Sequence, residues 1–292
     1  MEIITFDIEE WFARKKRYGS DKEKYAILDG YLDGILDKLD EQGIKGTFFC
    51  LGAMAVEFPS VIKKIDGRGH EVGCHSHLHQ WLNKISLDEV REDTRKAIDS
   101  LEQCIGKKVK SYRAPAFSIG EKNKKVFQIL AECGIERDAS VFPTARDIGG
   151  FPSFGHKTPV TVEYGGVSIK EFPICTTYIM GKEVAYSGGG YFRFFPLWFV
   201  EREMKRSDYT MTYFHIGDLH PEMSKVQTKA QYEAYFKEPG TLKNRYLRYF
   251  KSTVGKKQAY AKLMTLIERH DFVSLEQADR MIDWNSQATV VL

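Results

Sequence analysis

Three histidines stand on alternate positions of one short stretch, at His75, His77 and His79. They follow a run at 69–74 that predicts a short buried strand. Neutral imidazoles four residues apart, such as those of His75 and His79, are common metal ligands. Catalytic zinc usually takes three protein ligands and keeps one position open for water. This pair therefore predicts that the rest of the chain supplies a carboxylate ligand, a base and an acid.

Side chains suited to acid–base chemistry also lie at the ends of other predicted strands. Asp7 and Glu9 end the first β-type run of the chain, Arg113 ends another, and His215 ends a late one. The C-terminal ends of parallel strands meet on one side of a βα fold, so we expect these groups to converge. Each residue alone is more often structural, as a helix cap or a hydrogen-bonded histidine. Together they predict an active site.

The elements that must position these residues alternate between strand and helix through the first half of the chain. Strands are expected at 2–8, 46–52, 69–74 and 109–114, and helices at about 28–39, 59–65, 86–104 and 121–133. The helix at 28–39 has leucine and isoleucine at helical spacing, and Ser86 with Glu89 forms a capping box. This alternation predicts parallel strands with crossover helices, in a barrel or an open sheet.

The pattern changes after about residue 141. β-type runs flank Gly165-Gly166, which predicts an inserted β-hairpin. The three glycines at 188–190 predict a loop, either for close backbone approach or as a flexible link. A helix at 196–205 and a strand at 210–215 follow. No linker or repeat is visible, so we expect one domain over 1–292.

Composition excludes several classes of protein. The 292 residues are 42% hydrophobic and 28% charged, which is typical of a globular domain, and the net charge of +3 is too small to predict nucleic-acid binding. The segment 243–262 has seven basic residues and no acidic one, which favours a solvated helical face over a polyanion or lipid-headgroup contact. The five scattered cysteines favour reduced thiols over disulfides.

The sequence also predicts no targeting signal. No apolar run approaches the roughly 20 residues that a membrane helix needs, and the N-terminus lacks the basic and apolar regions of a signal peptide. We therefore expect no integral membrane segment and a cytoplasmic location. The basic tail and an aromatic content of 13% leave an oligomer possible.

Five short segments of the sequence form an ordered set of motifs: Thr5-Phe6-Asp7, His75-Ser76-His77-Leu78-His79, Arg113-Ala114-Pro115, Asp138-Ala139-Ser140 and Thr212-Tyr213-Phe214-His215. They match or resemble, in order, the motifs of the polysaccharide deacetylases of the NodB-homology type, carbohydrate esterase family four. The chain therefore resembles that family. The resemblance implies a distorted (β/α)7 barrel. The residues from about 186 onward resemble a subgroup tied to exopolysaccharide loci.

The resemblance also implies roles for the matching residues. Asp7 would be the general base, held by Arg113, and His215 the general acid. His75 and His79 would bind the metal, and the backbone N–H of Ala116 would stabilise the oxyanion.

Two departures from the family pattern affect this assignment. An Asp-Asp pair in the family is Asp7-Ile8-Glu9-Glu10 here; strand alternation puts Glu9 on the side of Asp7, so we expect Glu9 as the third ligand and Glu10 as the alternative. The fourth motif lacks its later Asp-Trp. Asp138 or Asp218 would then orient His215, and Phe142 or Trp81 would supply the missing apolar wall.

Contacts to the substrate are expected from the glycine segment. Tyr191 and Arg193 are the candidates, together with Trp81, and a packed segment with Arg193 in a structural ion pair is the equal alternative. His77, between the two ligands, is expected to be structural or to support them.

The predicted function is a metal-dependent de-N-acetylase that releases acetate from an N-acetylated sugar in a polysaccharide or its precursor. Zinc is the expected metal on availability, although the ligands also suit cobalt, nickel or iron. One alternative is a metal-independent hydrolase of a non-sugar amide or ureide C–N bond. Another is a non-catalytic carbohydrate-binding protein, which is disfavoured because such a protein needs no paired acid and base.

Overall fold

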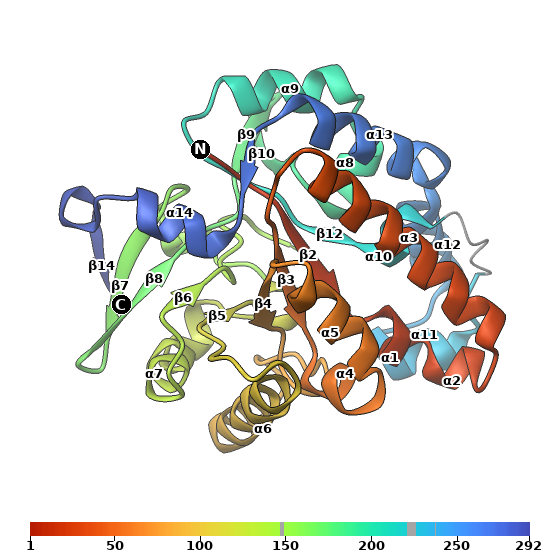
Figure 1. The fold of residues 1–292 in the computed structure, drawn as a ribbon, viewed down its shortest axis with the longest axis horizontal. Helices are drawn as coiled ribbons and strands as arrows, with labels where there is room; N and C mark the ends of the chain where they lie inside the picture. The colour runs from red at the N-terminus through yellow and green to blue at the C-terminus, as the bar shows by residue number, and fades with distance from the viewer. Residues whose placement is uncertain (147–148, 221–225, 237) are drawn as a thin grey trace.

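A nine-stranded sheet forms the centre of the protein, in a computed structural model that describes residues 1–146, 149–220, 226–236 and 238–292 (Figure 1). Its strands run parallel, except that β7 and β8 are antiparallel. The order across the sheet is β12 (Phe214–His215), β2 (Thr5–Ile8), β3 (Thr47–Cys50), β4 (Glu71–Cys74), β5 (Ser111–Tyr112), β6 (Arg137–Asp138), β8 (Val167–Glu171), β7 (Val160–Tyr164) and β14 (Thr289–Val291).

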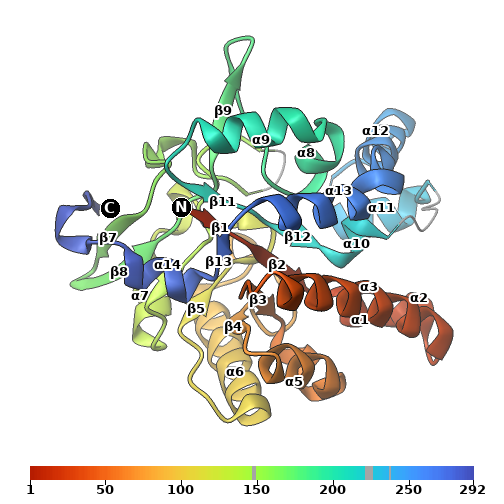
Figure 2. The same ribbon diagram turned by 45° about the horizontal axis from the view of Figure 1, so that its top comes forward.

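A second, three-stranded sheet extends the first at the N-terminal ends of β2 and β12. It places β1 (Glu2–Ile3) between β11 (Thr210–Met211) and β13 (Phe272–Val273), all parallel (Figure 2). The chain passes from β1 to β2 and from β11 to β12 with only short breaks. A curved, mostly parallel arrangement of this kind is barrel-like and confirms the predicted α/β fold.

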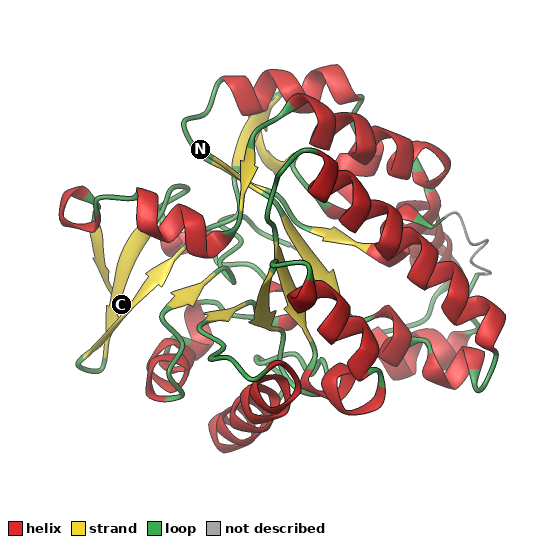
Figure 3. Ribbon diagram, in the orientation of Figure 1, coloured by secondary structure: helices red, strands yellow, loops and turns green. Residues whose placement is uncertain are grey.

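Helices cover the outer side of the strands (Figure 3). Those that follow strands of the first half are α3 (Lys22–Glu41), α4 (Gly52–Glu57), α5 (Pro59–Gly67), α6 (Leu87–Ile105) and α7 (Lys125–Glu132). The buried face of α3 consists of the leucine and isoleucine residues that the helical spacing predicts. The later helices are α8 (Gly189–Phe194), α9 (Leu197–Lys205), α10 (Ile216–Leu219), α11 (Lys229–Phe236), α12 (Leu242–Thr253), α13 (Lys256–Arg269) and α14 (Leu275–Met281).

Side-chain alternation along the strands divides the core into two parts. In β3, Phe48 lies on the side of the helices and its ring stacks on Phe6 with centroids 4.8 Å apart. Its neighbour Phe49 points to the opposite side, where it joins a smaller cluster with Phe117 and Tyr213. This smaller cluster packs inside the curved sheet and supports the polar residues at the C-terminal strand ends.

The predicted hairpin is confirmed, whereas the predicted glycine loop is wrong. β7 and β8 pair through Gly165 and Gly166, whose positive φ angles of 60° and 82° suit a tight hairpin turn. Gly188, by contrast, precedes helix α8, and a Cβ there would lie 2.1 Å from the carbonyl oxygen of Tyr213. Close backbone approach therefore explains this glycine, and a flexible link does not.

The predicted capping box at the start of α6 is present. The N–H of Glu89 donates to Ser86 Oγ at 3.3 Å, and the N–H of Ser86 donates to Glu89 Oε2 at 2.8 Å. Two otherwise unpaired N–H groups are thus satisfied at the start of the helix.

Replacing Ser86 by alanine is expected to lower the free energy of unfolding by about 1 kcal/mol, because an N-cap acceptor is lost. Urea unfolding followed by circular dichroism measures the change. Ser100→Ala, inside the same helix, is the matched control and should leave the unfolding midpoint almost unchanged. An equal loss in both variants would contradict the capping role.

Candidate metal centre and acid–base site

Glu9, His75 and His79 come together at the C-terminal ends of β2 and β4. One potential ligand atom from each residue lies within 4.8 Å of the others, and Glu9 Oε2 is 2.6 Å from His79 Nε2 and 3.8 Å from His75 Nε2. His75 Nδ1 is 2.7 Å from the carbonyl oxygen of Arg113. Because a carbonyl oxygen can only accept, Nδ1 carries the hydrogen and Nε2 keeps its lone pair for a metal.

The chemistry of these three residues fits a divalent metal. His75 Nε2 is buried and makes no hydrogen bond to the described residues, and Glu9 Oε2 is buried beside it with His79 Nε2 as its neighbour. Burial lowers the pKa of His75 to about 4, so its imidazole is neutral at pH 7. Burial would raise the pKa of Glu9, but the charge of His79 lowers it further, so the carboxylate is ionised. Two imidazoles and a carboxylate are the donors of zinc and related sites.

Glu9, rather than Glu10, faces the histidines. Glu9 precedes the short helix α1 (Glu10–Ala13), where β2 has already ended. Glu10 is buried and accepts a hydrogen bond from the N–H of Gly217 at 2.5 Å. Burial and the neighbouring Glu9 raise the pKa of Glu10 to about 7. The geometry thus agrees with the preference for Glu9, whose role as a ligand stays a prediction.

The loop that carries the histidines has an unusual backbone. Ser76 and His79 have φ angles of 67° and 58°, in the left-handed region that non-glycine residues rarely adopt. The N–H of His79 donates to Ser76 Oγ at 3.0 Å. Asp93 of α6 accepts from the N–H groups of His77 at 2.7 Å and Leu78 at 3.2 Å. These hydrogen bonds stabilise the strained backbone that aims His79 at Glu9.

His77 points away from the cluster, against the helices. A Cβ at Gly52 would lie 2.5 Å from His77 Nδ1 and 2.5 Å from the Cα of Ala97. Close packing between α4 and α6 agrees with the structural role expected for this histidine.

Asp7 and Arg113 form a buried ion pair beside the cluster of Glu9, His75 and His79. Arg113 Nη1 donates to Asp7 Oδ1 at 2.9 Å and to Thr5 Oγ1 at 2.7 Å, and its Nε donates to the carbonyl of Ala139 at 3.2 Å. The guanidinium lies 4.3 Å from the ring centroid of Phe49. Burial would raise the pKa of Asp7, but Arg113 and nearby histidines lower it below its usual range. Asp7 is therefore an ionised carboxylate.

His215 stands next to Asp7 because their strands pair in register. β12 lies beside β2, and His215 is the register partner of Asp7. His215 Nε2 is 3.4 Å from Asp7 Oδ2, and Nδ1 is 3.2 Å from Asp218 Oδ2. Burial would lower the pKa of His215, but Asp218, Asp7 and Glu9 raise it to about 10. A protonated imidazole thus faces an ionised carboxylate, as an acid and a base require.

The prediction that Asp138 orients His215 is wrong, and its alternative Asp218 has that position. Asp138 is fully buried on β6, where it accepts from Ser140 Oγ at 2.5 Å and pairs in register with Glu171 of β8. Burial raises the pKa of Asp138 to about 6 and that of Glu171 well above its usual range. Two adjacent buried carboxyl groups cannot both ionise, so this pair shares a proton.

The prediction that Arg193 contacts the substrate is also wrong. Arg193 is buried, and its guanidinium donates to the carbonyl groups of Lys251, Ser252 and Val254. Its Nε is 3.1 Å from Asp218 Oδ1. The structural ion pair is therefore the correct alternative. Sequence spacing could not reveal it, because all partners lie 25 or more residues away.

The remaining predicted contacts are Ala116 in the turn after β5, Trp81 in the loop after the histidines, and Tyr191 on helix α8. Ala116 has a φ of 54° and Phe117 one of 53°, a strained turn directly after Arg113-Ala114-Pro115. Tyr191 is half-buried, with its ring 6.4 Å from that of Phe142. Phe142 is fully buried, so it packs beneath the site rather than lining it. Trp81 is half-buried. The substrate contacts of Ala116, Tyr191 and Trp81 stay predictions.

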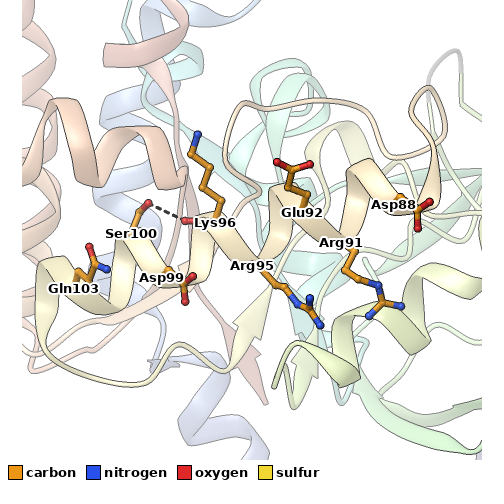
Figure 4. A pocket seen from close by; sticks show the side chains of 8 residues that line it. All are labelled: Asp88, Arg91, Glu92, Arg95, Lys96, Asp99, Ser100 and Gln103. Carbon is orange, nitrogen blue, oxygen red and sulfur yellow. Dashed lines mark hydrogen bonds between the residues drawn. The ribbon is translucent and has the colours of Figure 1, made fainter.

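A shallow surface hollow runs along α6, away from these residues (Figure 4). Its side chains come from one helix and alternate in sign, with Arg91, Arg95 and Lys96 beside Glu92 and Asp99. Mixed charges on one exposed helix face are typical of solvation, so the hollow is not a second site.

Two family models match this chain, one for each half. Residues 4–137 match the polysaccharide deacetylase family, and residues 139–280 match a domain of unknown function, DUF3473. The first segment contains Asp7, Glu9, both histidines of the cluster and Arg113. The second contains His215.

Among curated proteins, the chain is 38% identical over 91 residues to a peptidoglycan-N-acetylglucosamine deacetylase of Bacillus cereus, covering 31% of this chain and 33% of that protein. It is 29% identical over 104 residues to the peptidoglycan-N-acetylmuramic acid deacetylase PdaA of Bacillus subtilis, covering 33% and 40% of the two chains. The chain thus spans less than half the length of these relatives.

A solved structure extends the similarity in fold to the whole chain. The crystal structure of a candidate polysaccharide deacetylase from Mycobacterium smegmatis superposes with a TM-score of 0.62 at 18% identity, covering 99% of this chain and 92% of that one. The polysaccharide deacetylase model thus matches residues 4–137, and the chain as a whole shares the fold of this solved structure.

Proposed function

We propose that this protein is a divalent-metal-dependent de-N-acetylase that hydrolyses the N-acetyl group of an amino sugar in a polysaccharide or its precursor. The observation that carries the proposal is the pairing of ionised Asp7 with protonated His215 beside the Glu9–His75–His79 cluster. An amide carbonyl is a weak electrophile and its amine a poor leaving group, so the reaction needs a base, an acid and an electrophile together.

Glu9, His75 and His79 would hold the metal, with zinc the first choice on availability. When bound, such an ion polarises the acetyl carbonyl and lowers the pKa of water. The tautomer set by the Arg113 carbonyl and the strained loop anchored on Asp93 keep both imidazoles aimed at one point.

Acid and base act in sequence on the two sides of the amide. Asp7, fixed by Arg113, accepts a proton from the attacking water. His215 then gives a proton to the departing amine nitrogen, which leaves as a neutral amine. The N–H of Ala116, on its strained turn, would stabilise the oxyanion of the tetrahedral intermediate.

N-acetylated amino sugars are the proposed substrate class. The relatives reported above are named for N-acetylglucosamine and N-acetylmuramic acid deacetylation. Tyr191 and Trp81 are half-buried and would contact the sugar rings. None of the described helices has the length and apolarity needed to cross a bilayer. The link to exopolysaccharide loci, the cytoplasmic location and the single domain stay predictions.

The proposal is tested by metal content together with acetate release from N-acetylglucosamine oligomers. We expect about one metal ion per chain by elemental analysis, and loss of both metal and acetate release in His79→Ala, since a ligand is removed. His156→Ala, a histidine outside the cluster, is the control and should keep both. A metal-free wild-type protein that remains so after supplementation would refute the ligand assignment.

Asp7→Asn is expected to lower acetate release by more than about 100-fold, because a general base contributes that much or more. Binding of N-acetylglucosamine oligomers, measured by calorimetry, should persist, because the metal ligands and the proposed contacts Trp81 and Tyr191 remain. Asp271→Asn, on the exposed surface, is the control for loss of a carboxylate. Full turnover in Asp7→Asn would show that another group is the base.

Activity should also depend on pH in a defined direction. Turnover requires Asp7 ionised and His215 protonated, so it is lost at low pH as Asp7 protonates and at high pH as His215 deprotonates. A bound cation lowers the pKa of His215, so the alkaline loss falls below pH 10. A pH profile of kcat measures both limits. An alkaline limit unchanged in a residually active His215→Gln variant would contradict this assignment.

A further inference from the structure

A chain of ion pairs connects the proposed acid to the far end of helix α12. Arg193 Nε lies 3.1 Å from Asp218 Oδ1, and Asp218 Oδ2 lies 3.2 Å from His215 Nδ1. His215 Nε2 in turn lies 3.4 Å from Asp7 Oδ2. Asp218 therefore bridges an arginine and the imidazole with its two oxygens, and its pKa is lowered because His215 and Arg193 outweigh burial.

Arg193 is held in place by the turn between α12 and α13. Nη1 donates to the carbonyl oxygens of Ser252 at 2.9 Å and Val254 at 3.1 Å, and Nη2 donates to that of Lys251 at 2.9 Å. The turn packs closely on Arg193, since a Cβ at Gly255 would lie 2.2 Å from the Arg193 carbonyl oxygen. Carbonyl acceptors at a helix end suit a cation, so the side chain is fixed by backbone rather than by mobile side chains.

Two further contacts fix the helix that carries Arg193. Its first residues lie against the residue directly before β12, where the N–H of Gly189 donates to the carbonyl of Tyr213 at 2.9 Å. At its other end, Lys262 Nζ of α13 donates to the carbonyl of Phe195 at 2.7 Å. Helix α8 is thus attached at both ends, and Arg193 cannot move without breaking these bonds.

We infer that Arg193 is a positioning residue, which fixes Asp218 so that Asp218 aims His215 at the leaving nitrogen. This inference rests on the proposed function. All three residues lie within 139–280, the segment matched to a domain of unknown function. That segment supplies the acid and the groups that aim it, whereas residues 4–137 supply the base and the metal ligands.

The same contacts replace what the fourth motif lacks. The chain has Val141 and Phe142 where the family has an Asp-Trp pair, and Asp138 lies with Glu171 instead of His215. Without Arg193, the Asp218 carboxylate would be free to turn toward water, and the imidazole would lose the partner that fixes its ring. The proton would then be presented at variable geometry, which slows transfer.

The test compares the pH profile of acetate release in wild type, Arg193→Met, Arg193→Lys and Asp218→Asn. The groups that face His215 are Asp7, Glu9, His79 and Asp218, and only the last is altered or released by these variants. We expect kcat to fall roughly 10- to 100-fold in Arg193→Met and Asp218→Asn, as for other outer partners of catalytic groups. In Asp218→Asn the alkaline limit should move down by about one pH unit or more, because His215 loses a negative partner. In Arg193→Met it should also move down, because the released Asp218 carboxylate turns away from His215; a carboxylate that stayed in place without the arginine would raise the limit instead. Arg193→Lys should recover part of both effects.

Exposed residues of the same segment give the matched controls, Arg206→Met and Asp271→Asn, which should keep the wild-type profile. A uniform fall in kcat with an unmoved alkaline limit would overturn the inference, since it would mean a merely structural role. Should Arg193→Met not fold, Arg193→Lys tests the role of Arg193 by the same criterion. Asp218→Asn, which conserves the shape of the side chain, then tests the contact between Asp218 and His215.

A readout that needs no turnover separates this inference from the proposed function. If wild type releases no acetate, the proposed function fails, and NMR titration of the His215 imidazole still tests the positioning. A lower titration midpoint in both Asp218→Asn and Arg193→Met supports it. An unchanged or higher midpoint in Arg193→Met overturns it, because Asp218 would then keep its place without the arginine.

Discussion

The buried ion pair between Asp7 and Arg113 is the interaction on which the rest of the site depends. Taking two charges out of water costs several kcal/mol per ion unless each is paired and hydrogen-bonded. Arg113 meets this condition through Asp7, Thr5 and the carbonyl of Ala139, and its face lies on Phe49. The same residue acts a second time, because its backbone carbonyl sets the tautomer of His75. One arginine thus keeps the proposed base ionised and holds a proposed metal ligand in the tautomer that leaves Nε2 open.

Sheet order explains how the two halves of the chain make a single site. β2 is flanked by β3 of the first half and by β12 of the second, so Asp7 and His215 become register partners although they are far apart in the sequence. The histidine loop lies two strands away on β4, and Glu9 crosses this distance because it leaves the end of β2. The proposed acid, base and ligands meet only when both segments have folded into one sheet. This arrangement gives the C-terminal segment a chemical reason to accompany the segment that matches the deacetylase model.

Local patterns predict those features that depend on local interactions. The buried face of α3, the capping box of α6 and the hairpin turn at Gly165-Gly166 follow from spacing, from side-chain acceptors and from backbone freedom, all of which act over a few residues. Strand ends also predict which of the reactive groups converge, because parallel strands present their C-terminal ends together. The preference for Glu9 over Glu10 agrees with the structure for a different reason, because β2 ends at Ile8 and Glu9 faces the histidines from the residue that precedes helix α1.

Contacts made over long sequence distances were not predictable in this way. The sequence leaves a substrate contact and a structural ion pair equal for Arg193, because nothing nearby shows that three carbonyl groups near residue 252 surround it. Asp138 matches the family motif, yet its neighbour in the sheet is Glu171, which only the strand order reveals. The glycines near 188 read as a loop because the close approach of Tyr213 is a tertiary contact.

The most direct test of the central claim is a crystal structure of the metal-loaded protein with anomalous diffraction recorded at the absorption edge of the ion. The structure predicts a single anomalous peak at about 2.0 to 2.2 Å from Glu9 and from Nε2 of both His75 and His79, since those are the usual distances for zinc. A peak elsewhere, or one coordinated by Glu10 with Glu9 turned away, would contradict the assignment on which the acid and base roles depend.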